Sequence, residues 1–334
     1  MYQIQTPYLL FLGDAPDQLA AKTARGINDW RPEKVVGQMS LENCKADLGL
    51  PELGLQEAYD KGARTLVLGT ANRGGVISAV WMDVLKEALH IGYDIANGLH
   101  NKVNDIVDVA GLATQLDKNI YDVRHPTEQF PIGTGEKRSG KRLLPVGTDC
   151  SCGKMYTSLA LEKEMLSRGM NATFRATGQT GILVSGSGAS IDAVVADFMA
   201  GAVETIAPAN EDPNHWDIIE GQGSLAHPSY SGVTMALIHG GQPDAMVLCH
   251  EPTRSHMRGL PHQKVPAIKE VLSLATTLAQ IVNNDAKFIG ICVNTSQMVA
   301  RDIEGYLKKL EDEHGLPACD PYSQGTAKIV DMVS

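Results

Sequence analysis

The chain has 334 residues, a formal net charge of −10, 43% hydrophobic residues and 20% charged residues. This length allows two domains of ordinary size, and the composition is typical of a globular protein. The acidic balance argues against a nucleic-acid-binding protein, because the release of counterions from a polyanion requires a basic surface.

The first residues, MYQIQTPYLLFLGD, lack the basic segment and the long apolar segment of a signal peptide. No apolar run approaches the roughly 18 residues that a membrane-spanning helix needs. The six cysteines are scattered along the chain, which favours free thiols in a reducing compartment. We therefore expect a cytoplasmic protein that binds neither nucleic acid nor membrane.

The first part of the chain alternates short apolar runs with amphipathic stretches, as parallel strands joined by helices do. Strands are predicted at 8–13, 35–39, 65–69 and 94–97, and helices at about 17–28, 77–91 and 102–116. This pattern predicts a Rossmann-like N-terminal domain over residues 1–130. In such sheets ligands bind at the carboxyl ends of the strands.

A stretch rich in Gly, Pro and charge predicts a linker over 131–141, and a second α/β pattern then begins. Strands are predicted at 142–146, 171–176, 216–220, 245–250 and 287–293, with helices at about 153–168, 189–206, 230–239, 265–283 and 297–314. Residues 142–334 are thus predicted to form a doubly wound parallel-sheet domain of the P-loop NTPase type. The apolar helix at 265–283 leaves room for a symmetric interface, so a homo-oligomer is expected.

The strongest motif is the segment GTDCSCGKMYT at 147–157, which follows an apolar strand and opens a helix. Backbone N–H groups in such a loop and the positive end of the helix dipole attract phosphate, and the lysine adds a full charge. The sequence therefore predicts a phosphate-binding P-loop made by Gly147, Thr148, Asp149, Cys150, Ser151, Cys152, Gly153, Lys154, Met155 and Tyr156.

Met155 stands where NTP-hydrolysing enzymes place a Ser or Thr that holds Mg²⁺. A thioether is a poor ligand for a hard cation, and Thr157 lies on another side of the helix. The CxC pair Cys150 and Cys152 is a weak metal signal without a second pair. No tightly bound metal is expected, and the loop suits a diphosphate that is held rather than cleaved.

Polar residues after the other strands of the second domain are candidates for catalysis or substrate binding. Glu220 ends a strand and precedes a Gly-rich turn, and His227 follows in a loop, so either could act as a general base. Asp192 lies at the start of a predicted helix beside a Gly-rich loop; it is a further catalytic candidate, or it only favours the helix dipole. Arg254, Arg73 and Ser224 are candidates for binding substrate, the arginines through carboxylates.

Three segments of this chain resemble one two-domain family, long described as a domain of unknown function. They are GTDCSCGKMYT, ATGQTGILVSGSGASIDAVVADFMAGAVE and IEGQGSLAHPSYSGVT, and they follow the Rossmann-like part. The family includes bacterial D-glutamate N-acetyltransferases. The form of the P-loop is also similar to that of dethiobiotin synthetase.

The resemblance implies transfer of an acetyl group from acetyl-CoA to the amino group of a D-amino acid, with D-glutamate as the expected acceptor. The P-loop would then hold the diphosphate of acetyl-CoA. His227 or Glu220 would be the base, backbone N–H groups near 221–224 the oxyanion donors, and Arg254 or Arg73 the carboxylate ligands. The alternatives are an ATP-dependent kinase or ligase of the dethiobiotin synthetase type and a non-catalytic nucleotide sensor.

Overall fold

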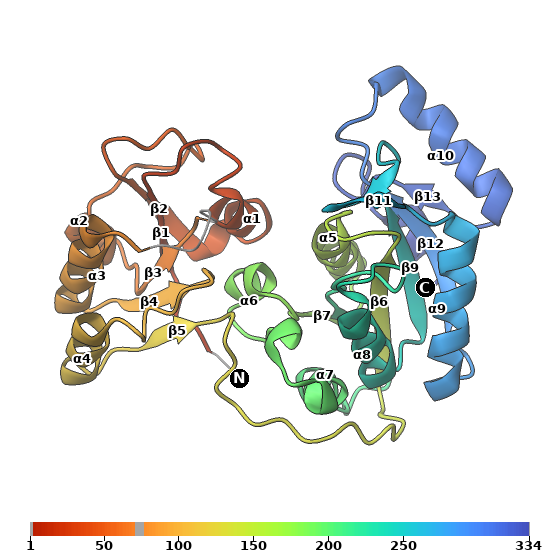
Figure 1. Ribbon diagram of the computed structural model, residues 1–334, viewed down its shortest axis with the longest axis horizontal. Coiled ribbons are helices and arrows are strands. Elements are labelled where there is room, and N and C mark those ends of the chain that lie inside the picture. The colour runs from red at the N-terminus through yellow and green to blue at the C-terminus, as the bar shows by residue number, and fades with distance from the viewer. Residues whose placement is uncertain (1–2, 71–76, 334) are drawn as a thin grey trace. The chain divides into compact units, whose positions relative to one another are not determined.

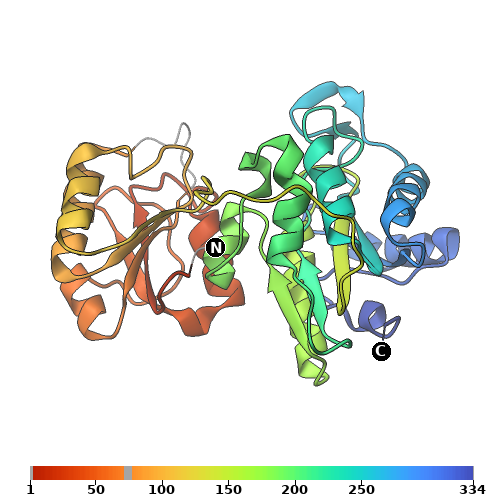
Figure 2. The same cartoon turned by 90° about the horizontal axis from the view of Figure 1, so that it is seen from below.

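The computed structural model describes residues 3–70 and 77–333, and Figures 1 and 2 show its ribbon in two views. The chain divides into two compact units. The first unit combines Met1–Glu128 with Gly178–Ala193, and the second combines Gln129–Thr177 with Val194–Ser334. Within the described residues, no helix is both long and apolar enough to cross a membrane.

The first unit contains a parallel sheet in the order β2-β1-β3-β4-β5. Its strands are β1 (Tyr8–Gly13), β2 (Val35–Ser40), β3 (Thr65–Leu68), β4 (Asp94–Asn97) and β5 (Ile120–Asp122). The three central strands β1, β3 and β4 are buried along their whole length, which explains the apolar runs in β1 and β3. The sequence predicted four of these strands and missed the short β5.

Helices cover both faces of this sheet (Figures 1 and 2). They are α1 (Lys22–Trp30), α2 (Leu55–Asp60), α3 (Ala79–Ile91), α4 (Val107–Gln115) and α6 (Gln179–Ser185), with 3₁₀ turns η1 (Pro32–Lys34) and η3 (Ile191–Ala193). A core of buried side chains joins the sheet to α2, α3 and α4. Helix α3 has local signals at both ends: the Ser78 side chain accepts from Trp81 N, and Gly92 ends the helix in the left-handed region.

The segment Gly178–Ala193 corrects one part of the sequence analysis, which assigned every residue after 141 to the C-terminal domain. The segment packs within the first unit. Lys34 Nζ donates to the carbonyl oxygens of Val184 and Ser185 at 3.1 and 2.7 Å, and Ile4 N donates to Gly186 O at 3.0 Å. The partners of Lys34 lie 150 and 151 positions away in the chain, so local sequence patterns carry no sign of the pairing.

The helix predicted over 189–206 is also wrong. The structure has the 3₁₀ turns η3 and η4 (Ala196–Phe198) there, and an α-helix forms only at α7 (Met199–Ile206). The Ser190 hydroxyl does not cap a helix but donates to Val123 O at 2.9 Å.

The second unit is built on a parallel sheet in the order β13-β12-β9-β6-β8-β7. Its strands are β6 (Lys141–Gly147), β7 (Ala172–Arg175), β8 (Trp216–Ile219), β9 (Ala245–His250), β12 (Lys287–Val293) and β13 (Ala318–Cys319). Strands β10 (His256–Met257) and β11 (Leu260–Lys264) form a separate antiparallel pair after β9. The predicted fold class, two parallel-sheet α/β domains, is confirmed.

Helices α5 (Lys154–Ser167) and α11 (Ala327–Val330) pack on one face of this sheet through a shared apolar core. Helices α7, α8 (Ser231–Gly241) and α9 (Ile268–Val282) are neighbours in space, as Figure 1 shows. Helix α10 (Ala300–His314) precedes β13 and contacts it. In the sheet, strand β6 lies between β8 and β9.

Candidate functional site

The candidate site lies where three neighbouring strands of the second unit end. Strands β8, β6 and β9 finish at Ile219, Gly147 and His250. Because the strands are parallel, the loops that follow them meet at one edge of the sheet, where doubly wound folds bind ligands. The predicted P-loop and the candidates Glu220, His227 and Arg254 all follow these strands.

The P-loop has the backbone of a tight turn. Ser151 and Gly153 both lie in the left-handed region, with φ of 51° and 107°. A Cβ atom on Gly147 would lie 2.6 Å from Cys152 Sγ and 2.9 Å from Lys154 Nζ. The loop is therefore folded closely over the end of β6, and only glycine fits at position 147.

Lys154 directs its ammonium group back over the loop rather than into solvent. Its side chain is buried, and Nζ donates to Asp149 O at 2.9 Å and lies 3.6 Å from Cys152 Sγ. A Cβ atom on Gly221 would lie 2.9 Å from Lys154 Cδ, so the aliphatic stem crosses the end of β8. A buried ammonium in such a loop is typical of groups that bind phosphate oxygens, and phosphate binding by Lys154 stays a prediction.

The first turn of α5 also carries Thr157, and the expectation that no metal is bound tightly stays a prediction. Thr157 is buried, and its hydroxyl accepts a hydrogen bond from Cys249 Sγ at 3.3 Å. It therefore does not replace the hydroxyl that Met155 lacks. Tyr156 turns to another side of the helix and packs against Tyr322, with ring centroids 5.9 Å apart.

Arg254 holds the P-loop in place. Its Nη1 donates to Asp149 Oδ2 at 2.9 Å and to Cys150 O at 2.6 Å, and its Nη2 donates to Ser151 O at 2.8 Å. Its Nε lies 2.8 Å from Glu251 Oε2. The sequence predicted that Arg254 binds a substrate carboxylate, whereas every one of these contacts joins it to the protein itself.

Asp149 is the centre of this arrangement. Besides Arg254, its Oδ2 accepts from Arg258 N at 2.9 Å, and its Oδ1 accepts from Cys150 N at 2.7 Å. The carboxylate thus joins the P-loop to the segment that precedes β11. The sequence analysis assigned Asp149 to phosphate binding and contained no signal for this structural role, because Arg254 and Arg258 lie more than 100 positions away.

His250 supports the P-loop from the end of β9. The Thr148 hydroxyl lies 2.9 Å from His250 Nδ1, and Thr148 N donates to Cys249 O at 3.1 Å. Burial lowers the pKa of His250 to about 4, so the ring is neutral near pH 7 and the hydroxyl donates to an unprotonated Nδ1. His250 positions Thr148, which is a role that the sequence analysis did not assign.

Acidification is expected to destabilise the folded chain through His250. Its pKa is about 4 when folded and has an ordinary value of 6.5. Between these values the unfolded chain binds a proton that the folded chain does not, so the free energy of unfolding decreases as pH falls through this range. The whole difference amounts to about 3 kcal/mol. Urea unfolding of the wild type and of His250→Asn at a series of pH values measures it, and parallel curves for the two proteins would contradict the assignment.

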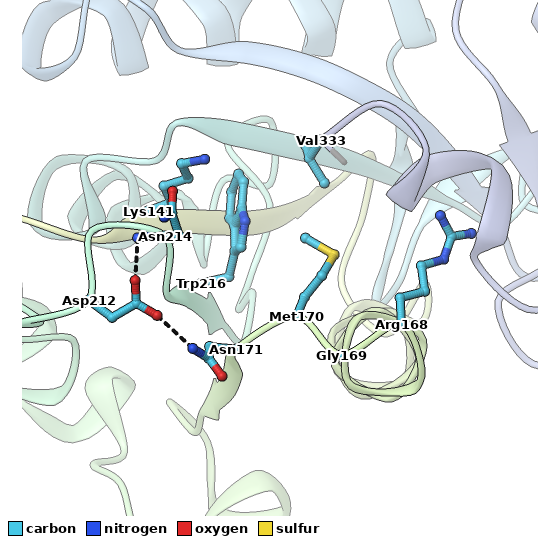
Figure 3. Close-up of a pocket in the computed structure, with 9 residues that line it drawn as sticks. All are labelled: Lys141, Arg168, Gly169, Met170, Asn171, Asp212, Asn214, Trp216 and Val333. Atoms are coloured by element: carbon cyan, nitrogen blue, oxygen red, sulfur yellow. Dashed lines mark hydrogen bonds between the residues drawn. The ribbon is translucent and has the colours of Figure 1, made fainter.

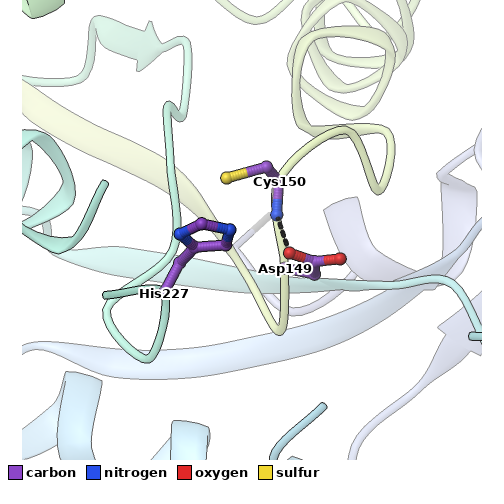
Figure 4. Close-up of side chains that lie close together, drawn as sticks. All are labelled: Asp149, Cys150 and His227. Carbon is purple, nitrogen blue, oxygen red and sulfur yellow. Dashed lines mark hydrogen bonds between the residues drawn. The ribbon is translucent and has the colours of Figure 1, made fainter. Parts of the chain in front are cut away.

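His227 lies against the P-loop. Its side-chain nitrogen, Cys150 Sγ and an Asp149 carboxylate oxygen are all within 4.8 Å of one another, and Figure 4 shows the three side chains side by side. Ser229 N donates to Nδ1 at 3.2 Å, and Nε2 lies 3.2 Å from Arg258 O. Both ring nitrogens therefore have backbone partners, which fix the proton on Nε2.

The same three side chains form a set of potential metal ligands, which tests the expectation that no metal is bound tightly. Burial raises the pKa of the Cys150 thiol, which opposes the thiolate that a metal requires. The Asp149 carboxylate is already neutralised by Arg254. This donor set therefore fits a cation poorly. Cys152 Sγ donates to Asp149 O at 3.1 Å and lines the loop, as expected.

Glu220 and Ser224 stabilise the loop that follows β8. Glu220 is buried and its Oε2 accepts from Thr177 N at 2.9 Å, while its carbonyl accepts from the Thr177 hydroxyl at 2.6 Å. Ser224 is also buried, and its carbonyl accepts from His227 N at 3.0 Å. Ser224 therefore shapes the turn that carries His227, and the substrate contact that the sequence analysis assigned to it stays a prediction.

The two remaining candidates are Asp192 and Arg73. Asp192 lies in the first unit, where its Oδ2 is 3.8 Å from Arg124 Nη1. Arg73 lies outside the described residues. Their predicted roles in catalysis and carboxylate binding stay predictions.

A cavity of about 630 Å³ opens at the other edge of the second sheet (Figure 3). Its lining includes Lys141 and Trp216, the first residues of β6 and β8, and Asn171, which precedes β7. The Lys141 ammonium lies 5.5 Å from the centroid of the Trp216 ring. These are the amino ends of the strands, so the cavity is not the candidate site.

The fold and the site define an α/β protein with a Rossmann-like unit and a P-loop unit. The family model for the Domain of unknown function (DUF1611_C) P-loop domain matches residues 131–330, and that for the DUF1611_N Rossmann-like domain matches 33–126. The chain belongs to the DUF1611 family.

Similar proteins cover almost the whole chain. A D-glutamate N-acetyltransferase from Tritonibacter scottomollicae is 58% identical over 331 residues, which is 99% of each chain. A D-glutamate N-acetyltransferase from a Pseudoalteromonas species is 47% identical over 328 residues, 98% of each chain. The crystal structure of a DUF1611 family protein from Anabaena variabilis is 31% identical, covers 98% of this chain and 99% of its own, and has a TM-score of 0.85.

Proposed function

We propose that this chain is a D-glutamate N-acetyltransferase and that acetyl-CoA is its acetyl donor. This is the activity that the sequence analysis expected and that the two relatives carry in their names. The observation that carries the choice of donor is the pair Lys154 and Met155. A buried ammonium is present for phosphate oxygens, while the hydroxyl that would hold Mg²⁺ is replaced by a thioether.

The reaction needs three functions from the protein. The base takes a proton from the ammonium group of the acceptor, and the free amine nitrogen then attacks the thioester carbonyl. The carbon–sulfur bond breaks, and the CoA thiolate takes up the proton that the nitrogen loses as the amide forms. Glu220 and His227 are the candidates for the base, and backbone N–H groups near 221–224 are the candidates for oxyanion donors. The P-loop holds the diphosphate of the donor.

A thiol-release assay with acetyl-CoA and a panel of D- and L-amino acids tests the proposal. We expect release with D-glutamate well above that with L-glutamate, and an N-acetylated product by mass spectrometry. No release with any member of the panel would remove the proposal. Mg²⁺-dependent formation of ADP stimulated by a small carboxylate would instead favour a ligase or kinase, the alternative that the P-loop itself suggests.

Replacing Arg254 by Gln is expected to raise KM for acetyl-CoA about 30-fold, since hydrogen bonds of a charged group contribute about 2 kcal/mol when they hold a loop in its binding form. Arg254→Lys should rescue little, because one ammonium cannot reach Asp149, Cys150 O and Ser151 O together. Steady-state kinetics with both substrates varied gives the measurement, and exposed Arg301→Gln is the control. If KM for D-glutamate rises instead, Arg254 binds the acceptor, as the sequence analysis predicted.

We further propose that the protein acts in the cytoplasm as a homo-oligomer. The six cysteines are all free, which suits a reducing compartment. Leu274 and Ile281 on α9 are 44% and 67% exposed, and covering such side chains favours association. Sedimentation velocity of the wild type and of a Leu274→Glu, Ile281→Glu variant tests the oligomeric state.

A further inference from the structure

The first unit has a cavity of its own at the edge where ligands of doubly wound sheets bind. Its volume is about 390 Å³, and its polar lining consists of His100, Asn101, Lys102, Asp105 and His125. The first four follow β4, and His125 follows β5. The cavity thus opens at the carboxyl ends of two neighbouring parallel strands. None of these residues belongs to the acetyl-CoA site proposed above.

The loop that carries the cavity is fixed by buried groups at the ends of these strands. Asp122 accepts from Val103 N and Asn104 N at 2.8 and 3.0 Å and from Asn97 Nδ2 at 2.6 Å. Asn97 Nδ2 also donates to Asn101 O at 2.9 Å. The lining side chains therefore stand on a preorganised loop, as binding residues on rigid scaffolds do.

Cationic side chains stand at this edge of the first unit. Lys102 lines the cavity together with the carboxylate of Asp105 and the imidazoles of His100 and His125. Arg124 is next to His125 in the chain and follows the end of β5 as well. Its Nε is buried and has no hydrogen-bond partner among the described residues. Its Nη1 lies 3.8 Å from Asp192 Oδ2, so this pairing leaves Nε without an acceptor, which is a costly arrangement that a bound carboxylate would relieve.

We propose that this edge of the first unit binds the carboxylates of the acceptor amino acid, with Lys102 and Arg124 as its cationic ligands. The proposal rests on the proposed function, because it takes the acceptor to be a dicarboxylic amino acid. Glutamate offers two carboxylates to two cations that stand after neighbouring strands. The phosphates of acetyl-CoA present similar oxygens, and the experiment below separates the two sources.

The test uses the full chain and the variants Lys102→Met and Arg124→Gln, with Lys61→Met as the control. Lys61 is an exposed lysine of the same unit and pairs only with Glu57 on the surface among the described residues. We expect Lys102→Met and Arg124→Gln each to raise KM for D-glutamate about tenfold. KM for acetyl-CoA and the control should stay within about twofold of the wild type.

Calorimetric titration of D-glutamate into each protein without acetyl-CoA gives a readout that does not depend on turnover. The dissociation constant should rise about tenfold in both variants, while thermal unfolding shows that they remain folded. An increase in KM for acetyl-CoA alone, or unchanged D-glutamate affinity in folded variants, would overturn the proposal. Failure of the wild type to release thiol with D-glutamate would refute the proposed function instead, and the titration would still report on the site.

Discussion

Replacement of Lys154 by Met is expected to lower kcat/KM for acetyl-CoA by about 100-fold or more. Methionine keeps the length and the apolar stem that crosses Gly221, and it removes only the charge. The ammonium is buried and already oriented over the P-loop through Asp149 O. A charge held in a buried site interacts with phosphate oxygens far more strongly than one in water does, so its loss should weaken donor binding.

The matched control for this prediction is Lys163→Met, because Lys163 is an exposed lysine in the same helix α5. Its activity should equal that of the wild type. Thermal unfolding of Lys154→Met should show a folded protein. A folded Lys154→Met enzyme with wild-type kinetics for acetyl-CoA would mean that the P-loop does not hold the donor.

Glu220→Gln is expected to lower kcat about 100-fold if Glu220 takes the proton from the amine, since a positioned general base contributes two to four orders of magnitude. Glutamine keeps an oxygen for the hydrogen bond from Thr177 N, so the loop after β8 should be preserved. His227→Asn is expected to change kcat less. The lone pair on His227 Nδ1 accepts from Ser229 N, and the opposite nitrogen lies next to Arg258 O.

The pH dependence of kcat distinguishes a base from a residue that only shapes the loop. The variant that lacks the base should lose the acidic limb of the profile, while a structural variant should keep it. If both variants retain the wild-type kcat, the base lies away from the P-loop. The pantetheine arm between the diphosphate and the thioester of acetyl-CoA makes such an arrangement possible.

The sequence predicted most of the fold because most of its central strands contain apolar runs bounded by turns. Strands 8–13, 94–97, 245–250 and 287–293 were predicted with the bounds that the structure shows. The elements it missed are short, such as β13 and α11, with two and four residues. A periodic pattern needs more residues than these to become visible.

The P-loop could also be predicted, because strand, loop, lysine and helix follow one another in the chain. The contacts of Arg254 could not be predicted. An arginine that follows a strand gives the same sequence pattern whether its guanidinium contacts substrate or protein. Its partners Asp149 and Cys150 are more than 100 positions away. The polar residues after β4 and β5 line the cavity in the first unit. In the sequence they look like ordinary loop residues, because only the fold brings them together.

The central claim is that the P-loop holds the phosphates of the donor without Mg²⁺. The binding of CoA in the absence of the amino-acid acceptor tests this claim most directly. Calorimetric titrations would compare CoA with phosphate-free pantetheine, in Mg²⁺ and in a chelator, for the wild type and Lys154→Met. We predict that a chelator does not alter the binding of CoA to the wild type. Lys154→Met should bind CoA about 100-fold more weakly, and pantetheine should hardly bind to either protein. CoA binding that requires Mg²⁺, or that is equal in the two proteins, would contradict the account.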